Sequence, residues 1–363
     1  MILPSWPLSR PRIPQLPGLE QFTGEVMHSS AWHPDLDVTG RRVAVIGSGA
    51  SAVQIVPHLA GRASELIVFQ RTAPWILPRG DREIPIERRQ IYSEYPWLQA
   101  LARGWIYASR EVSVVGFVNA PLLLRGVERI ALAHLERSVT DPGLRAELTP
   151  DYRAGCKRIL LSDDYYPAVD REDVELVPSG VARFEPHAVV ASDGTRRDVD
   201  VVVLATGFEA TDMALAHRIT GREGRQLADV WRDGGMQALR GATVHGFPNL
   251  FFLIGPNSGL GHTSMIHVIE SQLAYLADGL ATLDSRNLDA IEPTAHAQDA
   301  WNAGLQKRLR RSVWATGGCS SWYQDPQGRI PTLWPGSTWR LRRATRRLDP
   351  LEYRLYPRQG RAS

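Results

Sequence analysis

Short β-branched runs and longer stretches with helical spacing alternate along this chain. A first apolar run at 43–46 leads into a glycine-bearing turn, an amphipathic stretch and a second apolar run at 65–69. A strand, a turn, a helix and a second strand in this order predict a β-α-β unit. The same alternation over the rest of the chain predicts an α/β fold.

Strand-like and helical signals continue beyond this unit. Apolar runs return at 174–177 and 199–205, and a buried strand is expected at 249–254, before a glycine-rich turn and a helix over 262–283. Residues 81–149 instead form longer segments rich in Arg, Leu and aromatic residues with helical spacing. They predict a helical insertion between the strands.

Five prolines fall within the first twenty residues, where each removes a backbone donor and fixes φ. This segment is therefore interpreted as a linker. We expect three parts: a linker and adjoining segment at 1–37, a dinucleotide-binding domain at 38–208 that contains the insertion, and a further domain at 209–363.

Composition is that of an ordinary globular protein, with 43% hydrophobic and 22% charged residues. The 42 basic and 39 acidic residues leave a net charge of +3, which is too small to indicate a nucleic-acid binder. The arginine-rich end at 340–347 is expected to be solvated surface, the alternative being a site for a polyanion.

The longest apolar stretch, at 112–124, is too short to cross a bilayer. A buried helix is expected here rather than a membrane contact, the alternative being a shallow contact with the membrane surface. Histidine spacing predicts no metal site, because His262 and His267 are five residues apart, unlike an HExxH pair. With no signal peptide at the start, the expected location is the cytoplasm.

The turn after the first apolar run has the GxGxxA pattern, in Gly47, Ser48, Gly49, Ala50, Ser51 and Ala52. Gly47 permits a tight turn, Gly49 lets the backbone approach a pyrophosphate, and Ala52 allows close packing of helix on strand. The start of the following helix offers free N–H groups. We therefore predict a dinucleotide site, the alternative being a glycine-bearing turn without a ligand.

The end of the second apolar run indicates which dinucleotide binds. NAD-specific proteins usually carry Asp or Glu here, whereas this chain has Gln70, Arg71 and Thr72. The Arg71 guanidinium can pair with a 2′-phosphate that a carboxylate would repel, and Thr72 adds a hydroxyl. The predicted cofactor is NADP(H), unless Arg71 is only a surface residue.

The residues ahead of this unit resemble a known family. Phe22, Gly24, His28 and Trp32 fit the FxGxxxHxxxW fingerprint of Baeyer–Villiger monooxygenases, which are class B flavoproteins, and they stand just before the NADPH-binding strand as in that family. The family pattern continues with Pro or Asp, where this chain has His33. Oxidation of a ketone or of a heteroatom therefore stays open.

Further segments extend the resemblance over nearly the whole chain: GCKRILLSDDYYPAV from Gly155, the ATG segment ending at Gly207, GFPNLFFLIGPNSGLGHTSMI from Gly246, and CSSWYQDPQGRIPTLWPGSTW from Cys319. The last of these is most similar to the 4-hydroxyacetophenone monooxygenase branch. The resemblance implies an enzyme that uses NADPH and FAD to insert one oxygen atom of O2 into a ketone or a soft heteroatom through a C4a-peroxyflavin. The small-molecule substrate and the oligomeric state stay open.

The resemblance also implies roles for single residues. Arg158 matches the active-site arginine beside the flavin, and Lys157 matches a lysine that helps to bind the 2′-phosphate; otherwise they would be an ordinary basic pair on a loop. His28 and Trp32 are implied to act in domain positioning and cofactor communication, with plain packing as the alternative for Trp32. Gly207 and Asn257 are further candidates for cofactor binding, Asn257 near the isoalloxazine.

Family members begin with another Rossmann unit, for FAD, which this chain lacks. The expected fold is a Rossmann-type NADPH-binding domain with a helical insertion, followed by the C-terminal part of a FAD-binding domain. We expect a truncated or alternatively started monooxygenase that alone binds FAD weakly or not at all. The alternative is an inactive NADPH-binding fragment, or a subunit that needs a partner or a longer form to supply the FAD-binding half.

Overall fold

The computed structural model describes residues 1–4 and 8–358. The chain divides into two compact units, which we name by their dominant elements. The sheet unit comprises Pro11–Glu83 and Leu124–Phe208, and the helical unit comprises Met1–Arg10, Ile84–Leu123 and Glu209–Ser363. The helical segment expected at 81–149 thus contributes to both units.

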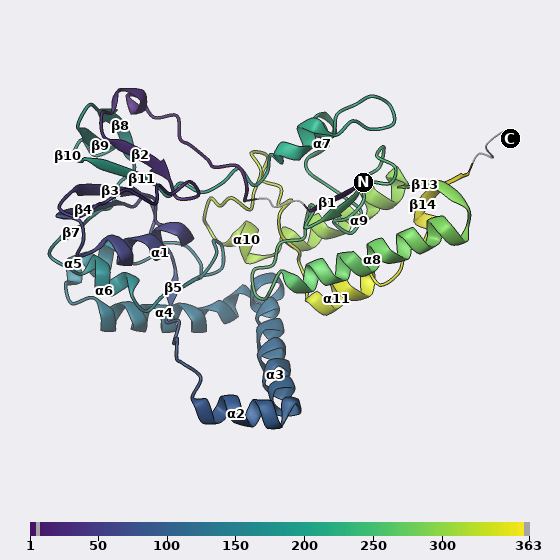
Figure 1. The fold of residues 1–363 in the computed structure, drawn as a ribbon, viewed down its shortest axis with the longest axis horizontal. Helices are drawn as coiled ribbons and strands as arrows, with labels where there is room; N and C mark the ends of the chain where they lie inside the picture. Colours follow the sequence, from purple (N-terminus) through teal and green to yellow (C-terminus); the bar gives the residue numbers. More distant parts are fainter. Residues whose placement is uncertain (5–7, 359–363) are drawn as a thin grey trace. The chain divides into compact units, whose positions relative to one another are not determined.

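A five-stranded parallel sheet forms the centre of the sheet unit (Figure 1). Its strands in spatial order are β2 (Glu25–His28), β11 (Val201–Leu204), β3 (Arg42–Ile46), β4 (Glu65–Phe69) and β7 (Val174–Val177). Val43 and Val45 face one hydrophobic cluster, whereas Ala44 and Ile46 face another. Because both faces are covered, the three central strands β11, β3 and β4 are almost entirely apolar, which is why they stand out in the sequence.

Different elements cover the two faces. One face packs against α1 (Ala50–Leu59), α4 (Leu124–Ser138) and α6 (Tyr165–Val169), and α5 (Pro142–Glu147) follows α4 along the chain. The other face packs against an antiparallel sheet in the order β10 (Arg196–Asp198), β9 (Ala188–Ala191), β8 (Val181–Glu185), and against Phe22. The unit also contains η1 (Leu19–Gln21) and the parallel pair β5 (Ile76–Leu77) and β6 (Leu160–Leu161).

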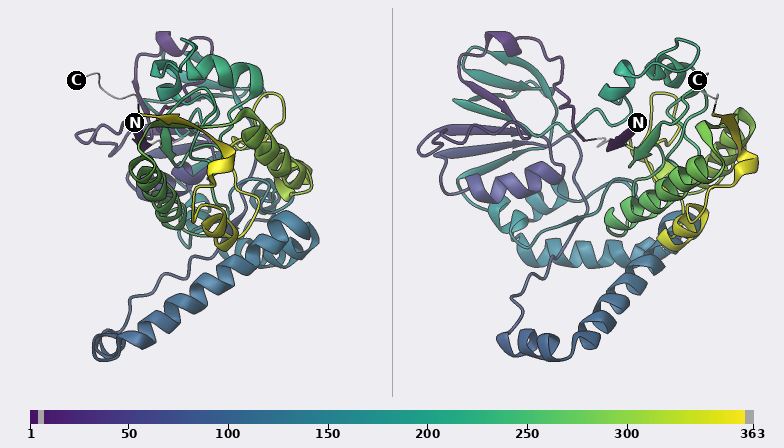
Figure 2. Two further views of the ribbon diagram at one scale, coloured as in Figure 1. Left: turned by 90° about the vertical axis from the view of Figure 1, so that its right-hand side faces the viewer. Right: turned by 45° about the vertical axis from the view of Figure 1, so that its right-hand side comes forward.

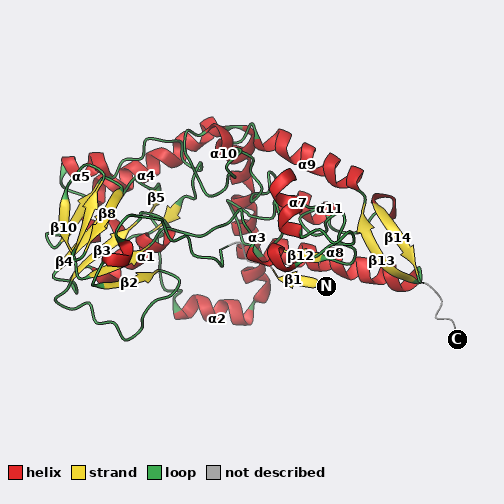
Figure 3. Ribbon diagram, turned by 90° about the horizontal axis from the view of Figure 1, so that it is seen from above, coloured by secondary structure: helices red, strands yellow, loops and turns green. Residues whose placement is uncertain are grey.

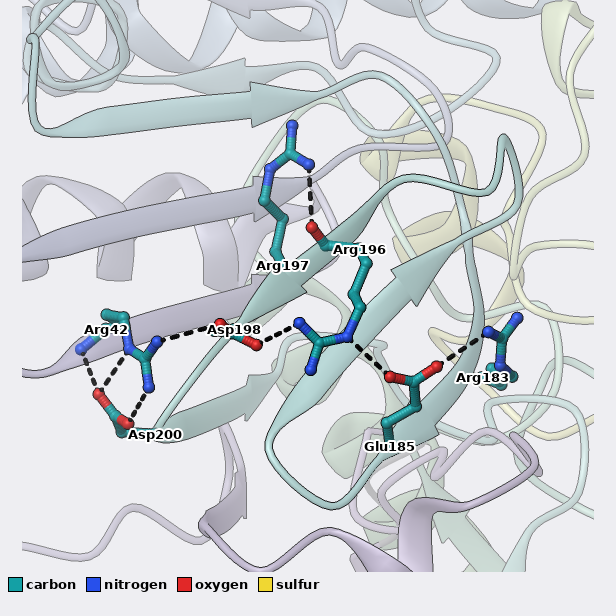
Figure 4. A network of polar contacts seen from close by, with 7 residues as sticks. All are labelled: Arg42, Arg183, Glu185, Arg196, Arg197, Asp198 and Asp200. Carbon is teal, nitrogen blue, oxygen red and sulfur yellow. Dashed lines mark hydrogen bonds and ion pairs between the residues drawn. The ribbon is translucent and has the colours of Figure 1, made fainter.

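Ion pairs link this antiparallel sheet with the start of β3 (Figure 4). The Glu185 carboxylate accepts hydrogen bonds from Arg183 at 2.9 Å and from Arg196 at 2.8 Å, and the Arg42 guanidinium pairs with Asp200 at 2.7 Å. These side chains are a third to a half exposed, so each pair contributes at most about 1 kcal/mol. We regard this network as surface structure rather than a ligand site.

The helical unit contains the remaining elements. Its helices are α2 (Ile86–Glu94), α3 (Pro96–Val114), α7 (Leu227–Gly234), α8 (Ile266–Ser285), α9 (Ala295–Leu309), α10 (Val313–Thr316) and α11 (Thr338–Ala344). Shorter segments are the π-helical η2 (Val115–Asn119) and the 3-10 turns η3 (Pro121–Leu123), η4 (Ala214–Arg218) and η5 (Pro350–Glu352). β13 (Leu288–Pro293) and β14 (Tyr353–Pro357) pair antiparallel beside α8 (Figure 3), and β1 (Ile2–Pro4) pairs in parallel with β12 (Phe251–Leu253).

The α/β prediction is confirmed, and β4 and β7 have the expected bounds. The strand expected at 249–254 is shorter, because Asn249 and Ile254 have φ angles of 55° and 63°, which a strand does not accommodate. The helix expected from 262 begins at Ile266. In the loop before this helix, Gly259 forms an isolated bridge with Leu333.

Two further expectations need correction. Residues 2–4, expected to be linker, form β1 because their backbone finds partners on β12. The stretch at 112–124, expected to be a buried helix, is divided among the end of α3, η2, η3 and the start of α4, and it is only partly buried. Phe117 stacks on Trp314 with ring centroids 6.0 Å apart, whereas Val112 and Leu122 are exposed.

Candidate functional site

The glycine turn lies where the chain path through the parallel sheet reverses. From β3 the chain runs through α1 to β4 on one side, whereas β11 lies on the other side of β3. In open α/β sheets, ligands bind at the carboxyl ends of strands that meet at such a switch point. Gly47 follows β3 and Gly207 follows β11, so both predicted residues stand at this point.

The two glycines of the turn differ in what surrounds them. Gly47 has φ of +119°, and a Cβ at this position would overlap the carbonyl oxygen of Ala205. Gly49 is the N-cap of α1, and a Cβ there would meet nothing within 4 Å. Gly47 therefore serves the packing of the turn, whereas Gly49 leaves an open approach to the backbone.

The start of α1 is free to bind an anion. No side chain caps it, so its first N–H groups are available at the positive end of the helix dipole. Ala50 is exposed and Ser51 is half-buried, whereas Ala52 is fully buried against the sheet. The predicted roles of these positions are thus compatible with a phosphate group above the turn.

Two cations lie beside this turn. Arg71 is exposed after β4, and Lys157 is half-buried with its Nζ 4.9 Å from the centre of the Tyr152 ring. Burial and then the charge of Arg71 lower the pKa of Lys157, against a weaker opposing effect of Asp151. No carboxylate among residues 1–4 and 8–358 forms an ion pair with either cation. Two such neighbouring positive charges favour an anionic ligand, because it would relieve their repulsion.

Gln70 is a residue that the sequence analysis did not include among the site residues. It is buried at the end of β4, where its Nε2 donates to the Glu147 carbonyl at 3.0 Å. Its Oε1 has no partner among the described residues. In the sequence, Gln70 is recognisable as a polar residue at the end of a buried strand, directly before Arg71.

The fingerprint residue His28 lies at the end of β2, which pairs with β11, and contacts the segment that follows β11. His28 is buried, its Nδ1 accepts from the backbone N–H of Ser30 at 3.2 Å, and its Nε2 donates to the Gly207 carbonyl at 3.1 Å. Burial lowers the pKa of His28, with a smaller opposing effect of the bond to Gly207. These contacts fix a neutral imidazole with its proton on Nε2.

The other fingerprint positions have different surroundings. Phe22 is buried, with its ring centroid 6.0 Å from that of Phe184. A Cβ on Gly24 would overlap the Phe22 ring and the Asp200 carbonyl, so only glycine fits there. Trp32 is 40% exposed.

Arg158 and Asn257 belong to different units and have different surroundings. Arg158 is exposed in the loop before β6, and no described residue forms a hydrogen bond or ion pair with it. Asn257 belongs to the helical unit and is buried with φ of 54°. Its Nδ2 donates to the carbonyls of Ile330 at 2.7 Å and Leu333 at 2.9 Å, and its Oδ1 has no partner among the described residues.

A second polar cluster, in the helical unit, was missed by the sequence analysis. The Glu111 carboxylate on α3 accepts from the backbone N–H of Thr338 at 2.9 Å and from its hydroxyl at 2.7 Å, and it lies 3.2 Å from Nε2 of the buried His262. The three residues are far apart in the chain, so no local pattern could reveal them. Across 1–4 and 8–358, no cluster of acidic, Cys or His side chains has a metal-binding arrangement, and no helix is long and apolar enough to span a membrane.

Comparisons with known proteins agree with this geometry. A family model described as flavin-binding monooxygenase-like matches residues 5–219. The chain is 49% identical to a Baeyer-Villiger monooxygenase from Streptomyces coelicolor and 46% identical to one from Pseudomonas aeruginosa; each alignment covers 96% of this chain, and 67% and 66% of the relatives. The chain therefore spans about two thirds of the length of these relatives.

Two solved structures show the same fold. Cyclohexanone monooxygenase from Rhodococcus sp. Phi1, bound to NADP+, superposes with a TM-score of 0.83 at 25% identity, covering 98% of this chain and 75% of that one. A steroid monooxygenase bound to NADP superposes with a TM-score of 0.81 at 27% identity and the same coverage. The Rossmann-type fold of the sheet unit is thus confirmed.

Proposed function

Because the chain belongs to the flavin-binding monooxygenase-like family, we propose that it binds NADPH and FAD and acts as a monooxygenase on a ketone or a soft heteroatom. One oxygen atom of O2 enters the substrate and the other leaves as water. NADPH supplies the two electrons. The named relatives and the two NADP-bound structures support this reaction class.

The open approach at Gly49, beside the uncapped start of α1, is the observation that carries the proposal. The NADPH pyrophosphate would lie against the N–H groups of this turn. Arg71, Thr72 and Lys157 would hold the 2′-phosphate, with the Arg71 guanidinium donating two hydrogen bonds to its oxygens.

The helical unit offers one feature that fits FAD. Asn257 keeps a buried carbonyl oxygen without a partner among the described residues, which can accept a hydrogen bond from an N–H group of the flavin. When bound, FAD would be the group that NADPH reduces and that then reacts with O2. In this chain, the unpaired Arg158 guanidinium would hold positive charge near the reacting oxygen, where negative charge develops.

His28 and Gly207 would position the cofactor rather than react. Since the His28 Nε2–H is committed to the Gly207 carbonyl, this bond fixes the ATG segment beside the glycine turn. Trp32, which is exposed next to this strand, is proposed to contact the cofactor or a neighbouring segment. The proposed location is the cytoplasm, where NADPH is available.

The test is made on the purified full chain. NADPH and NADH binding are measured by calorimetry, and the visible spectrum is recorded after addition of FAD. Oxygen consumption and NADPH oxidation are followed together with a panel of ketones and sulfides. Tight NADPH binding, a bound-flavin spectrum and substrate-dependent oxygen consumption are expected, and such a flavin spectrum would show that the expectation of weak FAD binding by this chain alone is wrong. Gly49→Ala should weaken NADPH binding at least about tenfold and lower oxygen consumption, but it should leave the flavin spectrum unchanged because it alters only the dinucleotide turn.

Two results would change the proposal. NADPH binding without oxygen consumption, restored by a longer form or a partner that contributes a FAD-binding half, would make this chain the NADPH-binding subunit of such an enzyme. Absence of NADPH binding would refute the proposal for the sheet unit itself.

A further inference from the structure

One side of α3 is apolar and exposed to solvent. Trp97, Leu101, Trp105 and Val112 are 59%, 62%, 73% and 69% exposed, and we call them the α3 stripe. Their spacing of four, four and seven residues keeps them on one side of the helix. Figures 1 and 2 show that the first half of α3, together with α2, extends away from α8 and α11 of the same unit.

The apolar surface continues past the end of α3. Val115, Leu122 and Leu123 are exposed in the segments that follow it. Trp339, in the first turn of α11, is also exposed, and α11 begins beside α3 because Thr338 donates to Glu111. Soluble proteins rarely leave so many large apolar side chains in contact with water.

A strongly basic surface adjoins this region. Nine residues, which we call the basic cluster, form no ion pair with a carboxylate among the described residues: Lys307, Arg308, Arg310, Arg311, Arg340, Arg342, Arg343, Arg346 and Arg347. Between 300 and 348 the sequence has one acidic residue, Asp325, which is paired with Arg329 at 2.7 Å. The basic cluster therefore keeps its full positive charge.

Two tryptophans lie against arginines of the basic cluster. Burial, and then the charge of Arg340, lower the pKa of Arg308. The Arg308 guanidinium is 5.5 Å from the Trp334 ring, and that of Arg343 is 5.9 Å from the exposed Trp339 ring. Trp339 thus joins the basic cluster to the apolar surface.

We propose that this face of the helical unit docks on an anionic phospholipid bilayer. The tryptophans of the α3 stripe would lie at the level of the headgroups, where an amphipathic ring is favoured, with Leu101 and Val112 in the outer acyl region. The arginines of the basic cluster would pair with lipid phosphates. Since no described helix is apolar enough to span, α3 would lie in the plane of the membrane surface.

Other occupants fit the observations less well. A second copy of the chain, paired through the same face, would bring two basic clusters together, and their repulsion opposes association. A nucleic acid would match the arginines but would leave Leu101 and Val112 without an apolar partner. A bilayer with anionic headgroups satisfies both the charge and the apolar side chains.

The test uses the full chain and vesicles of phosphatidylcholine, alone or mixed with phosphatidylglycerol. Co-sedimentation and the blue shift of tryptophan emission are measured at low and at high salt. Binding to the mixed vesicles at low salt is expected, weakened at least about tenfold by high salt or by removal of the anionic lipid. Equal binding to both kinds of vesicle, or none, would overturn the proposal.

Matched variants separate the two parts of the surface. Trp97→Ser with Trp105→Ser should abolish the blue shift, whereas Leu351→Ser, at a 91% exposed position in η5, should not change binding. The double variant Arg342→Glu, Arg343→Glu should weaken vesicle binding at least about tenfold. The control double variant Arg225→Glu, Arg232→Glu changes one arginine just before α7 and one within it, and it should have little effect on vesicle binding. Unchanged thermal unfolding of each variant shows that it is folded.

Two further measurements test the competing occupants. Light scattering over a range of protein concentrations would detect a dimer, and a dimer lost in the Trp97→Ser, Trp105→Ser variant would overturn the proposal in favour of a second copy. Binding of duplex DNA that equals vesicle binding and survives the tryptophan changes would overturn it in favour of a general polyanion site. Failure of vesicle binding leaves the NADPH proposal untouched, because that concerns the sheet unit.

Discussion

The Ser48 hydroxyl donates a hydrogen bond of 2.6 Å to the carbonyl oxygen of Thr72, which lies 24 residues further along the chain. This bond joins the glycine turn after β3 to the residues that follow β4. The groups proposed to bind the pyrophosphate and those proposed to bind the 2′-phosphate are therefore held as one structure. Such preorganisation reduces the entropy lost when the cofactor binds.

The two glycines of the turn should respond differently to a methyl group. Gly49→Ala should leave the free energy of unfolding nearly unchanged, because its Cβ meets no protein atom, and should weaken NADPH binding at least about tenfold by blocking the pyrophosphate. Gly47→Ala should destabilise the protein by about 1–3 kcal/mol, because its φ is positive and its Cβ overlaps Ala205. Urea unfolding and calorimetry measure both effects.

The opposite pattern, with Gly49→Ala unfolding the protein and Gly47→Ala neutral, would contradict this assignment of roles. A Gly49→Ala variant that is stable and binds NADPH normally would show that the dinucleotide does not approach this turn.

Arg71→Ala should weaken NADPH binding by about ten- to a hundredfold and leave NADH binding unchanged. The reason is that charge-assisted hydrogen bonds to a phosphate contribute about 1.5–3 kcal/mol, and NADH has no 2′-phosphate. The measurement is the ratio of the two dissociation constants at fixed salt. Arg62→Ala, an exposed arginine of the same unit, is the control for loss of charge; equal losses for both nucleotides would refute the role of Arg71.

Lys157→Met should raise the free energy of unfolding at neutral pH in the absence of nucleotide. Burial and Arg71 lower the pKa of Lys157 below its usual 10.5, so below the folded-state pKa the charged amine disfavours the folded state. This penalty disappears as pH rises through the folded-state pKa towards 10.5, and the advantage of the variant should shrink in that range. Urea unfolding as a function of pH tests it, and a variant that is less stable at pH 7 would count against it.

His28→Gln should flatten part of the dependence of stability on pH. Because burial lowers the pKa of His28 below 6.5, the unfolded chain binds a proton more readily, and the folded state loses stability as pH falls below 6.5. Gln does not titrate and can still donate to the Gly207 carbonyl. Comparison of the two unfolding free energies at pH 8 and pH 5 should show a smaller loss in the variant; parallel curves would disprove the contribution of His28.

The sequence determined the elements whose signals are local. The β3, α1 and β4 succession was predictable because its apolar runs, glycines and helix start fall within about thirty neighbouring residues. Gln70-Arg71-Thr72 could be assigned to one end of β4 for the same reason. The fingerprint placed His28 at the site, although its bond to Gly207 required the parallel pairing of β2 with β11.

Other features were decided only by the tertiary structure. The short β12 follows from positive φ angles at Asn249 and Ile254, which depend on what packs around them. Glu111 meets His262 and Thr338 although they are 151 and 227 residues away in sequence, and the exposure of the α3 stripe depends on which surfaces α3 leaves uncovered. Local patterning determines which segments are strands or helices, but contacts between distant segments determine which side chains are paired, buried or left to bind a partner.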